Sequence, residues 1–435
     1  MMHSLTNATV CFLVLLLYHG SVALNTASTS ITSSNNRDEL FRRIFTSDVP
    51  LLDVRAEIEF SKGAFPTSVN HPVLDDEQRH LVGICYKEKG PDAAFQLGFE
   101  LVTPVKEQRI NAWKQFIGKH PNGYLYCFRG GSRSQLTQKA LKEAGVNYPL
   151  IDGGFKAMRT YLLQELEEIQ HIPLVMISSR TCSGKTHLLS KMQLSHNVVD
   201  LEGLANHRGS TFGYVGVKAQ PTQIQFDNAL AIDFLKLREK NDNSPIFIEE
   251  EGNRIGDVRL PLSMHQKMLA EYPVIDLVTS MEERVDICVQ DYVTDLFPQF
   301  EATYDDVDLA HKAFQNHHLE SLKRIKKRLG GDNYQTVHAQ TVDALNSFQI
   351  SHGDLTGFRK PVKILLKYYD KMYDYQAEQR QGKVLFRGSS QEILDWVESD
   401  QGKHQLLQRQ TSSIMGDSLE SSLHPDDDGM ATMMI

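Results

Sequence analysis

The chain has 435 residues, which is enough for two or three domains of ordinary size. Hydrophobic residues make up 41% and charged residues 23%, a composition that excludes a fibrous or broadly disordered protein. The formal net charge of −9 gives no global sign of nucleic-acid binding, although it leaves room for a local basic patch. The five cysteines contain no CxxC pair, so they fit a reduced compartment better than a disulfide scaffold or a zinc site.

The N-terminus has the features of a targeting segment. Residues 10–17 form an apolar run that is too short to span a bilayer but suits the core of a signal peptide. No Lys or Arg precedes this run, and residues 25–36 are rich in Ser, Thr and Asn. We therefore assign residues 1–36 to a targeting or disordered extension, and both interpretations stay open.

In the next part of the chain, buried-strand patterns alternate with apolar residues at helical spacing. We predict strands at 49–55, 124–126 and 149–151, and helices at 75–80, 92–101, 105–117, 136–144 and 154–169. Strands that alternate with helices predict a parallel sheet covered by helices on both faces. This first domain is expected to span residues 37–170.

After Pro173 the alternation restarts and indicates a second α/β domain. Its buried strands are predicted at 174–177, 197–201 and 245–248, and the chain becomes mostly helical from about Leu309. The last residues contain Ser runs and three consecutive Asp, typical of a disordered acidic tail. We expect the second domain at 172–395, with a helical C-terminal part, and the tail at 396–435.

The loop Cys127–Ser134 (CFRGGSRS) carries the strongest chemical signal. A cysteine between a strand and a helix faces the N–H groups of the helix start, which favour an anion. Two consecutive glycines let further N–H groups converge, and two arginines add positive charge, so the thiol pKa should be lowered. A buried cysteine beside a glycine turn is the structural alternative, and cysteine phosphatases use a similar cradle. The candidate residues are the nucleophile Cys127 and the cradle Arg129, Gly130, Gly131, Ser132, Arg133 and Ser134.

A second signal lies at 179–186, which half-fits the phosphate-loop pattern GxxxxGK[ST]. Ser179 replaces the first glycine, so phosphate binding is better supported than nucleotide hydrolysis. Glu249–Glu251, after an apolar strand, are candidate carboxylates for a metal ion, although such runs are usually solvated. The candidate phosphate-binding residues are Ser183, Gly184, Lys185, which supplies a charge, and Thr186, whose hydroxyl suits Mg²⁺.

These loops lie within longer segments that resemble known families. The thiol loop resembles the active-site loop of rhodanese domains, and the chain from about residue 40 to about 390 resembles the tRNA 2-selenouridine synthase family. In that family a rhodanese domain precedes a P-loop domain. Ser179 and Cys182 depart from it, because they stand where glycine is usual, and Asn253 varies an acidic stretch. The matching segments are LLDVR (51–55), RHLVGICY (79–86), LIDGGF (150–155), DLEGLANHRGSTFG (200–213), QPTQIQFDN (220–228), EEEGNRIG (249–256), ERVD (283–286) and YYDKMYDY (368–375).

The resemblance implies a transferase that replaces sulfur by selenium in wobble 2-thiouridine of tRNA. Selenophosphate would supply the selenium, and the base would pass through an S-geranyl intermediate made with geranyl diphosphate. Cys127 would hold selenium as a perselenide, and the phosphate loop would hold the diphosphate. Mg²⁺ is a candidate ion, but no cofactor is firmly implied. The implied partners are tRNA and a selenophosphate synthetase, with no stable membrane partner.

Contacts with tRNA are predicted at His207, Arg208 and Arg284. The basic run 323–328 is a further candidate, because flanking apolar residues at helical spacing predict an amphipathic helix with one charged face. The neighbouring His317 and His318 lack further ligands at suitable spacing, so we predict no metal site there.

Other functions remain open at this point. A rhodanese-type sulfurtransferase would explain Cys127 but leave the second domain idle. A decayed phosphate-binding module, or an enzyme that only geranylates, would also fit parts of the pattern. The sequence decides neither the modified tRNAs, nor the 5-substituent of the uridine, nor the ligand of the phosphate loop, nor the oligomeric state. For location we expect an organelle (plastid or mitochondrion), reached through a removable signal, with the cytoplasm as the alternative.

Overall fold

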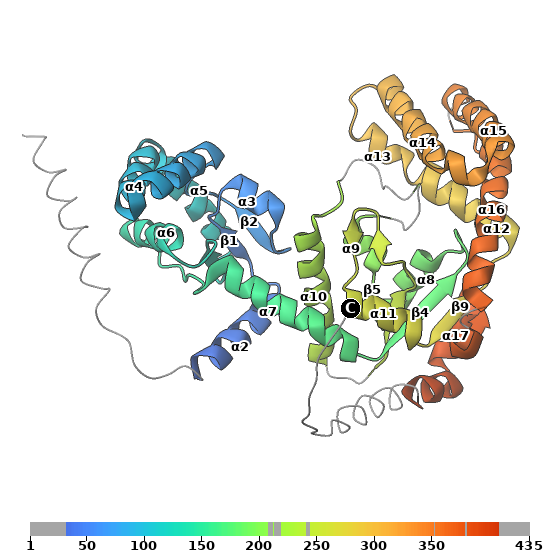
Figure 1. Ribbon diagram of the computed structural model, residues 1–435, viewed down its shortest axis with the longest axis horizontal. Coiled ribbons are helices and arrows are strands. Elements are labelled where there is room, and N and C mark those ends of the chain that lie inside the picture. The colour runs from blue at the N-terminus through green and yellow to red at the C-terminus, as the bar shows by residue number, and fades with distance from the viewer. Residues whose placement is uncertain are drawn as a thin grey trace, which may run out of the picture. The chain divides into compact units, whose positions relative to one another are not determined.

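The computed structural model describes residues 32–207, 212, 219–240, 244–351, 353–378 and 381–408 (Figure 1). The apolar run at 10–17 and residues 409–435 lie outside the described part. Helix α2 (Thr32–Thr46) begins five residues before the predicted domain start at 37. Residues 32–36 are therefore helical, and the predicted extension is shorter than expected. None of the described helices is both long and apolar enough to cross a membrane.

The first domain is built on a three-stranded parallel sheet in the order β2-β1-β3. Its strands are β1 (Leu51–Asp53), β2 (Ser68–Asn70) and β3 (Tyr124–Tyr126). Successive strand residues face opposite sides, so Leu52 and Leu125 pack with Trp113 in one core, while Tyr126 contacts Phe65 on the other side, with ring centroids 5.8 Å apart.

Helices cover both faces of this sheet, as predicted. Residues of α5 and α6 pack in the core with Leu52, whereas Phe155 of α7 packs against Phe65 on the other side, with ring centroids 5.1 Å apart. The helices of this domain are α3 (Glu57–Lys62), α4 (Asp76–Val102), η1 (Thr103–Val105), α5 (Lys106–Lys119), α6 (Ser132–Glu143), α7 (Gly154–Glu168) and η2 (Ile169–His171).

Three details differ from the predictions for this domain. The strand predicted at 149–151 is only an isolated bridge between Leu150 and Leu125. The helices predicted at 75–80 and 92–101 are parts of α4, which is interrupted at Gly90 (φ 86°) before Pro91. The strand predicted at 49–55 is limited to 51–53. Each error concerns where an element ends or pairs, which depends on its neighbours in space.

The second domain contains a five-stranded parallel sheet in the order β10-β9-β4-β6-β5. All six residues of the central strand β4 are buried, which explains its continuous apolar pattern. The strands are β4 (Leu174–Ser179), β5 (Asn197–Val199), β6 (Ile246–Glu249), β9 (Val274–Leu277) and β10 (Val384–Gly388), and a separate antiparallel pair is β7 (Arg254–Ile255) with β8 (Val258–Arg259).

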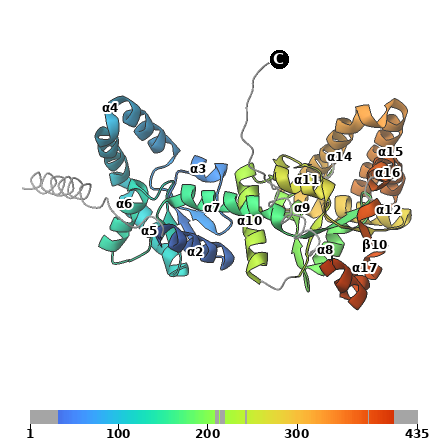
Figure 2. The same cartoon turned by 60° about the horizontal axis from the view of Figure 1, so that its bottom comes forward.

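Helices surround this sheet and form the predicted helical part. Figure 2 shows α14, α15 and α16 gathered beside α12. The phenyl rings of Phe297, Phe314 and Phe348 form the centre of the core between them, with centroids 5.1 to 5.9 Å apart. The helices are α8 (Lys185–Met192), α9 (Leu201–Ala205), α10 (Gln223–Lys240), α11 (Leu262–Ala270), α12 (Met281–Val289), the π-helix η3 (Gln290–Thr294), α13 (Phe297–Glu301), α14 (Val307–Leu329), α15 (Gly331–Ile350), η4 (Thr356–Phe358), α16 (Arg359–Glu378), η5 (Gln381–Lys383) and α17 (Ser390–Glu398).

The second domain extends beyond its predicted boundary at 395. Strand β10 follows the helical part and adds an edge to the sheet. Trp396, Val397 and Leu406 are buried in the same core as strand β4. The predicted tail is therefore wrong for the residues up to Leu406, because their apolar side chains complete the core of the sheet.

Candidate functional site

Cys127 lies at the carboxyl end of β3, where the chain turns into α6. Parallel sheets commonly place functional groups at this edge. Gly130 has a φ of +67°, and a Cβ there would lie 2.8 Å from the backbone N of Gly153. Gly131 has a negative φ and open space around it, so only the first glycine of the pair is required by the turn.

The Cys127 thiol is held in a setting that favours its anion. The residue is 3% exposed, and its Sγ lies 3.2 Å from the Ser134 hydroxyl. Burial raises the pKa of the Cys127 thiol. The hydrogen bonds from the Ser134 hydroxyl and from the N–H groups of Ser134 and Arg129, together with the charge of Arg133, outweigh it, so the pKa lies below its ordinary value.

The two arginines of this loop differ in what they contribute. Arg133 donates hydrogen bonds to both carboxylate oxygens of Glu59, at 2.5 and 3.2 Å, and Arg79 pairs with the same carboxylate at 3.0 Å. The charge of Arg133 is therefore largely compensated. Arg129 is exposed, and its guanidinium carbon lies 5.8 Å from the ring centroid of Phe128. Both arginines belong to the loop, as predicted, but a nearby carboxylate partly offsets the charge of Arg133.

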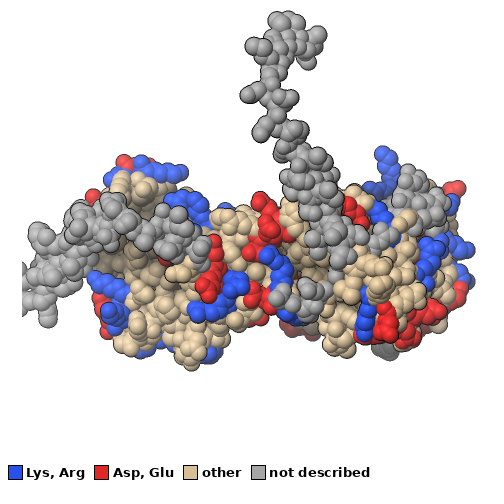
Figure 3. Space-filling model, turned by 90° about the horizontal axis from the view of Figure 1, so that it is seen from below, with Lys and Arg blue, Asp and Glu red and all other residues tan. Residues whose placement is uncertain are grey.

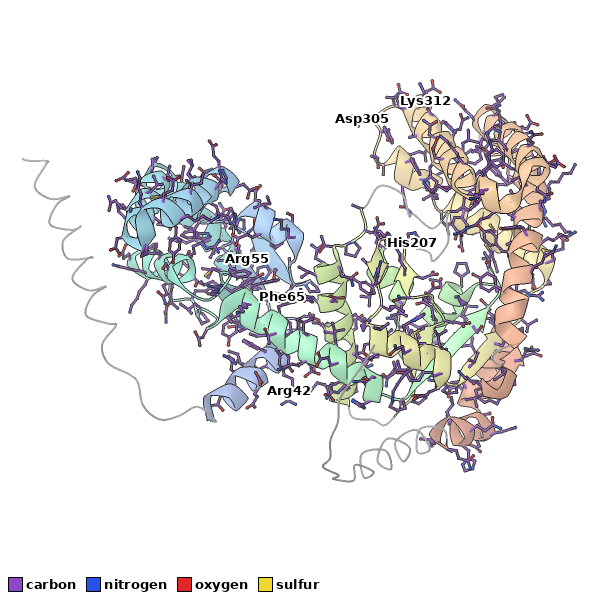
Figure 4. The ribbon with its side chains drawn as sticks, viewed as in Figure 1. Arg42, Arg55, Phe65, His207, Asp305 and Lys312 are labelled. Carbon is purple, nitrogen blue, oxygen red and sulfur yellow. The ribbon has the colours of Figure 1, made fainter. Side chains whose placement is uncertain are left out.

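A buried ion pair supports the thiol loop, and the sequence predicted no role for it. Arg55, labelled in Figure 4, is 2% exposed. Its Nη2 lies 2.6 Å from Oδ2 of the fully buried Asp53. The guanidinium of Arg55 also lies 4.0 Å from the ring centroid of Phe155, whose N–H donates to the carbonyl of Cys127. The sequence did contain a signal for this ion pair, because two opposite charges stand at the end of a predicted buried strand. The pair fixes the start of α7 against the loop.

The phosphate loop spans residues 180–184 between β4 and α8. Cys182 has a φ of +58° and Gly184 a φ of +85°. The left-handed region favours glycine, which accounts for the usual glycine at the position of Cys182. Together with Glu202, Glu251 and Tyr373, the loop lines an open pocket of about 560 Å³. This volume includes the solvent at the mouth of the pocket. Ser183, Gly184, Lys185 and Thr186 all line this pocket.

Lys185 is surrounded by carboxylates. Its Nζ lies 3.0 Å from the carbonyl oxygen of Glu250 and 3.3 Å from Oε1 of Glu251. Burial lowers the pKa of Lys185, but the nearby carboxylates of Glu251 and Glu202 raise it more, so the amine stays protonated. Lys185 thus offers the pocket a fixed positive charge for a phosphate oxygen.

Two buried acids near Lys185 have raised pKa values, and one of them, Glu202, lines the pocket. Burial, with the charge of Glu251, raises the pKa of Glu202 to about 8. Burial also raises the pKa of Glu249, whose Oε2 accepts the N–H of Leu201 at 2.7 Å. Oε1 of Glu249 and the hydroxyl of Ser183 are buried and lack a hydrogen-bond partner in the described part of the chain. Among the described residues no group of three or more acids, histidines and cysteines is arranged to hold a metal ion.

An open apolar pocket, about 670 Å³ including the solvent at its mouth, adjoins the phosphate pocket. The two pockets share Thr181, Cys182 and Tyr292 as lining residues. The other walls come from α12, η3, α14, α15, η4 and α16, with Phe212 added. The sequence predicted the phosphate loop but not this pocket, because its lining residues come from helices far apart in the chain.

The prediction that Arg284 contacts tRNA is wrong. Its side chain is buried and supports the phosphate loop. It is 1% exposed, donates to both oxygens of Asp370 at 3.0 and 2.6 Å, and donates from Nε to the carbonyl of Thr181 at 2.9 Å. Its helix α12 faces the loop, so the guanidinium is unavailable to a large ligand.

The other predicted tRNA contacts have different outcomes. His207 is only 9% exposed (Figure 4), and burial lowers its pKa, so it offers little surface to a macromolecule. Arg208 lies outside the described residues. On α14, Leu322, Ile325 and Leu329 are buried, which confirms the amphipathic pattern of the run 323–328. On the face seen in Figure 3, Lys and Arg are interspersed with Asp and Glu.

Comparison with known proteins identifies both domains. The model of the tRNA 2-selenouridine synthase AAA domain matches residues 172–404, and that of the rhodanese-like domain matches residues 36–160. The tRNA 2-selenouridine synthase of Marinobacter nauticus is 46% identical over 82% of this chain and 96% of its own length. The synthases of Pseudomonas entomophila and Pseudomonas savastanoi are 42% and 44% identical, again over 82% of this chain, and over 95% and 96% of their lengths. The chain therefore belongs to the tRNA 2-selenouridine synthase family.

Proposed function

We propose that this protein is an enzyme that replaces the 2-thio sulfur of a wobble uridine in tRNA by selenium. Family membership supports this function, since the relatives are named for it over nearly their whole length. The finer proposal is that the base passes through a geranylated intermediate. One observation supports it, namely that two pockets adjoin each other. A phosphate-binding pocket and an apolar pocket share three lining residues, as a donor with a diphosphate head and a hydrocarbon chain requires.

In the first step, the base is geranylated at sulfur. The diphosphate of geranyl diphosphate lies at the phosphate loop, where Lys185 and the N–H groups at the start of α8 receive it. The sulfur attacks the first carbon of the chain, the carbon–oxygen bond breaks, and the diphosphate leaves with the electron pair. Thr186 and Glu202, whose oxygens lie 3.2 Å apart, would hold a Mg²⁺ ion, which when bound would neutralise this charge.

In the second step, selenium replaces the geranylated sulfur. The Cys127 thiolate attacks the selenium of selenophosphate, the selenium–phosphorus bond breaks, and phosphite leaves with the electron pair, so that a perselenide anion is held in the cradle of N–H groups. The perselenide then attacks C2 of the geranylated base and geranyl thiolate leaves. A small-molecule thiol reduces the selenium–sulfur bond, which frees the selenium base and leaves Cys127 in a disulfide with that thiol. Geranylation turns the base sulfur into a leaving group, so the exchange needs no ATP. The selenophosphate comes from a selenophosphate synthetase, which is the partner that we expect beside tRNA.

The reaction is tested with purified protein lacking the first 31 residues. The protein is incubated with 2-thiouridine-bearing tRNA, selenophosphate and geranyl diphosphate, and the digested nucleosides are weighed by mass spectrometry. We expect a selenium nucleoside from the parent and only the geranylated nucleoside from Cys127→Ser, because serine cannot carry selenium.

Gln135→Ala is the matched control, since Gln135 is an exposed residue of α6 just after the loop. It should give the parental product. A parent that stops at the geranylated base would support geranylation alone. A parent that leaves the tRNA unchanged would contradict the proposal and favour a plain sulfurtransferase.

A further inference from the structure

One face of α16 runs along both pockets. Tyr373 lines the phosphate pocket, and Tyr369 lines the apolar pocket next to it. Further along the apolar pocket, the lining residues of this face are Leu366, Val362 and Phe358, the last immediately before the helix. They follow each other at steps of three or four residues, which is the spacing of a single helix face. The face therefore forms a continuous wall that leads away from the phosphate loop.

The phosphate end of this wall is fixed to the loop. Asp370 accepts two hydrogen bonds from Arg284, and the same guanidinium donates to the carbonyl of Thr181 in the phosphate loop. Because this arrangement is buried, it holds α16 at one position relative to the site of the diphosphate. The distance from that site to any residue along the wall is thereby set.

The far end of the wall is closed by an aromatic side chain. Phe358 is 4% exposed, and its ring lies 6.0 Å from that of Phe348, which belongs to the aromatic core with Phe297 and Phe314. A ring packed against a core cannot swing away without opening a cavity. Phe358 therefore acts as a stop, while Val362 lies one turn nearer to the phosphate loop.

The length of the wall suits a short isoprenoid. From Tyr369 to Phe358 the chain advances roughly 16 Å at about 1.5 Å per helical residue. An extended carbon chain advances about 1.2 Å per bond, so the eight-carbon main chain of a geranyl group spans roughly 9 Å and ends near Val362. The twelve-carbon main chain of a farnesyl group spans about 14 Å and reaches Phe358.

We propose that α16 measures the isoprenoid chain of the donor, with Val362 beside the end of a geranyl group and Phe358 as the upper limit. The inference rests on the proposed geranylation and adds the residues that select the chain length. Both residues act on specificity by shape, since neither side chain carries a charge or a nucleophile.

The test measures binding without the tRNA reaction. Thiolo-diphosphate analogues with five, ten, fifteen and twenty carbons are titrated into the chain by calorimetry, for the parent, Phe358→Ala and Val362→Phe. We expect the parent to bind the analogues with ten and fifteen carbons and to exclude the one with twenty. Phe358→Ala should improve the affinity for twenty carbons relative to ten by about tenfold, and Val362→Phe should shift the preference towards five carbons by a similar factor.

A control variant and a stability measurement distinguish a true change in chain preference from a loss of folding. Lys367→Ala, an exposed change on the same helix, should keep the parental preference. Thermal unfolding of each variant shows that the helix is still packed, and the pair of opposite shifts cannot arise from partial unfolding. Unchanged chain preference in both variants, with tight geranyl binding by the parent, would overturn this inference alone. If the parent binds none of the analogues, the proposed geranylation fails as well.

Discussion

The thiol loop and the phosphate loop have the same local architecture but treat charge in opposite ways. Each connects a parallel strand to the start of a helix, and each uses a positive φ in the turn. In the thiol loop the anion belongs to the chain, so hydrogen bonds from Ser134 and the backbone are already in place. In the phosphate loop the anion arrives with the ligand. Lys185 meanwhile contacts Glu251, and a bound diphosphate must take over that contact.

This difference teaches that a strand–loop–helix turn specifies an anion site but not its chemistry. The chemistry follows from the groups added around the turn. Glu59 compensates much of the charge of Arg133 near the thiol, so hydrogen bonds from the Ser134 hydroxyl and from backbone N–H groups contribute most to the lowered pKa of Cys127. Around Lys185, buried acids accumulate, so a bound diphosphate would require a cation beside it to balance the negative charge.

The largest expected effect comes from removing the buried ion pair that supports the phosphate loop. Arg284→Ala leaves Asp370 without its buried partner, so we expect the free energy of unfolding of the second domain to fall by about 3–5 kcal/mol. Urea unfolding measures this loss. Arg387→Ala, which breaks the exposed pair with Asp276, is the control and should cost less than about 1 kcal/mol. Equal losses would show that Arg284 has no special structural role.

The next largest effect distinguishes geranylation at the phosphate loop from selenium loading at the thiol loop. Lys185→Ala removes the fixed charge that receives the diphosphate, so geranylation should slow by about 10²–10³-fold. Loading of selenium on Cys127 should stay at the parental rate. Kinetics with geranyl diphosphate measure the first quantity, and mass spectrometry of the protein measures the second. Lys191→Ala, an exposed change on the same helix, should alter neither, and an unaffected geranylation rate in Lys185→Ala would remove the phosphate loop from this step.

A third effect concerns stability and pH in the phosphate pocket. Burial raises the pKa of Glu202 from 4.5 to about 8, so the folded chain keeps a proton that the unfolded chain loses. The free energy of unfolding should therefore fall as pH rises from about 4.5 to about 8 and change little above that. Glu202→Gln should flatten this slope, as measured by urea unfolding across the range. The exposed Glu301→Gln should keep the parental slope; if both variants keep it, Glu202 is not the group that titrates.

The smallest effect tunes the thiol loop. Ser134→Ala removes the hydroxyl 3.2 Å from Sγ of Cys127, so the pKa of the thiol should rise. A hydrogen bond to a charged group contributes about 1.5 kcal/mol or more, so alkylation by iodoacetamide at neutral pH should slow by roughly tenfold. The pH profile of the rate measures the shift. Gln135→Ala, an exposed change in α6, should leave the profile in place, and a matching shift in that variant would point to a general loosening of the loop.

Local signals in the sequence predicted the two loops well. The strand at 124–126 and the helix after it depend on near neighbours, and so does the turn at Gly184 before α8. The mostly helical part after Leu309 was also predicted, because its apolar spacing is regular.

The errors lie where distant residues decide the outcome. Strand β10 becomes a strand only because β9 offers a free edge, and Trp396 is buried only because the sheet lies beneath it. Arg284 resembles a surface charge in the sequence, yet Asp370, 86 residues away, makes it a core residue. The apolar pocket was missed for the same reason, since no short segment contains its walls.

The most direct test of the division of labour supplies the intermediate from outside. S-geranylated tRNA and selenophosphate are given to the parent, to Lys185→Ala and to Cys127→Ser, and the selenium nucleoside is quantified by mass spectrometry. If the two loops perform separate steps, Lys185→Ala forms the selenium nucleoside at the parental rate and Cys127→Ser forms none. Loss of the product in Lys185→Ala, or its formation by Cys127→Ser, would contradict the account.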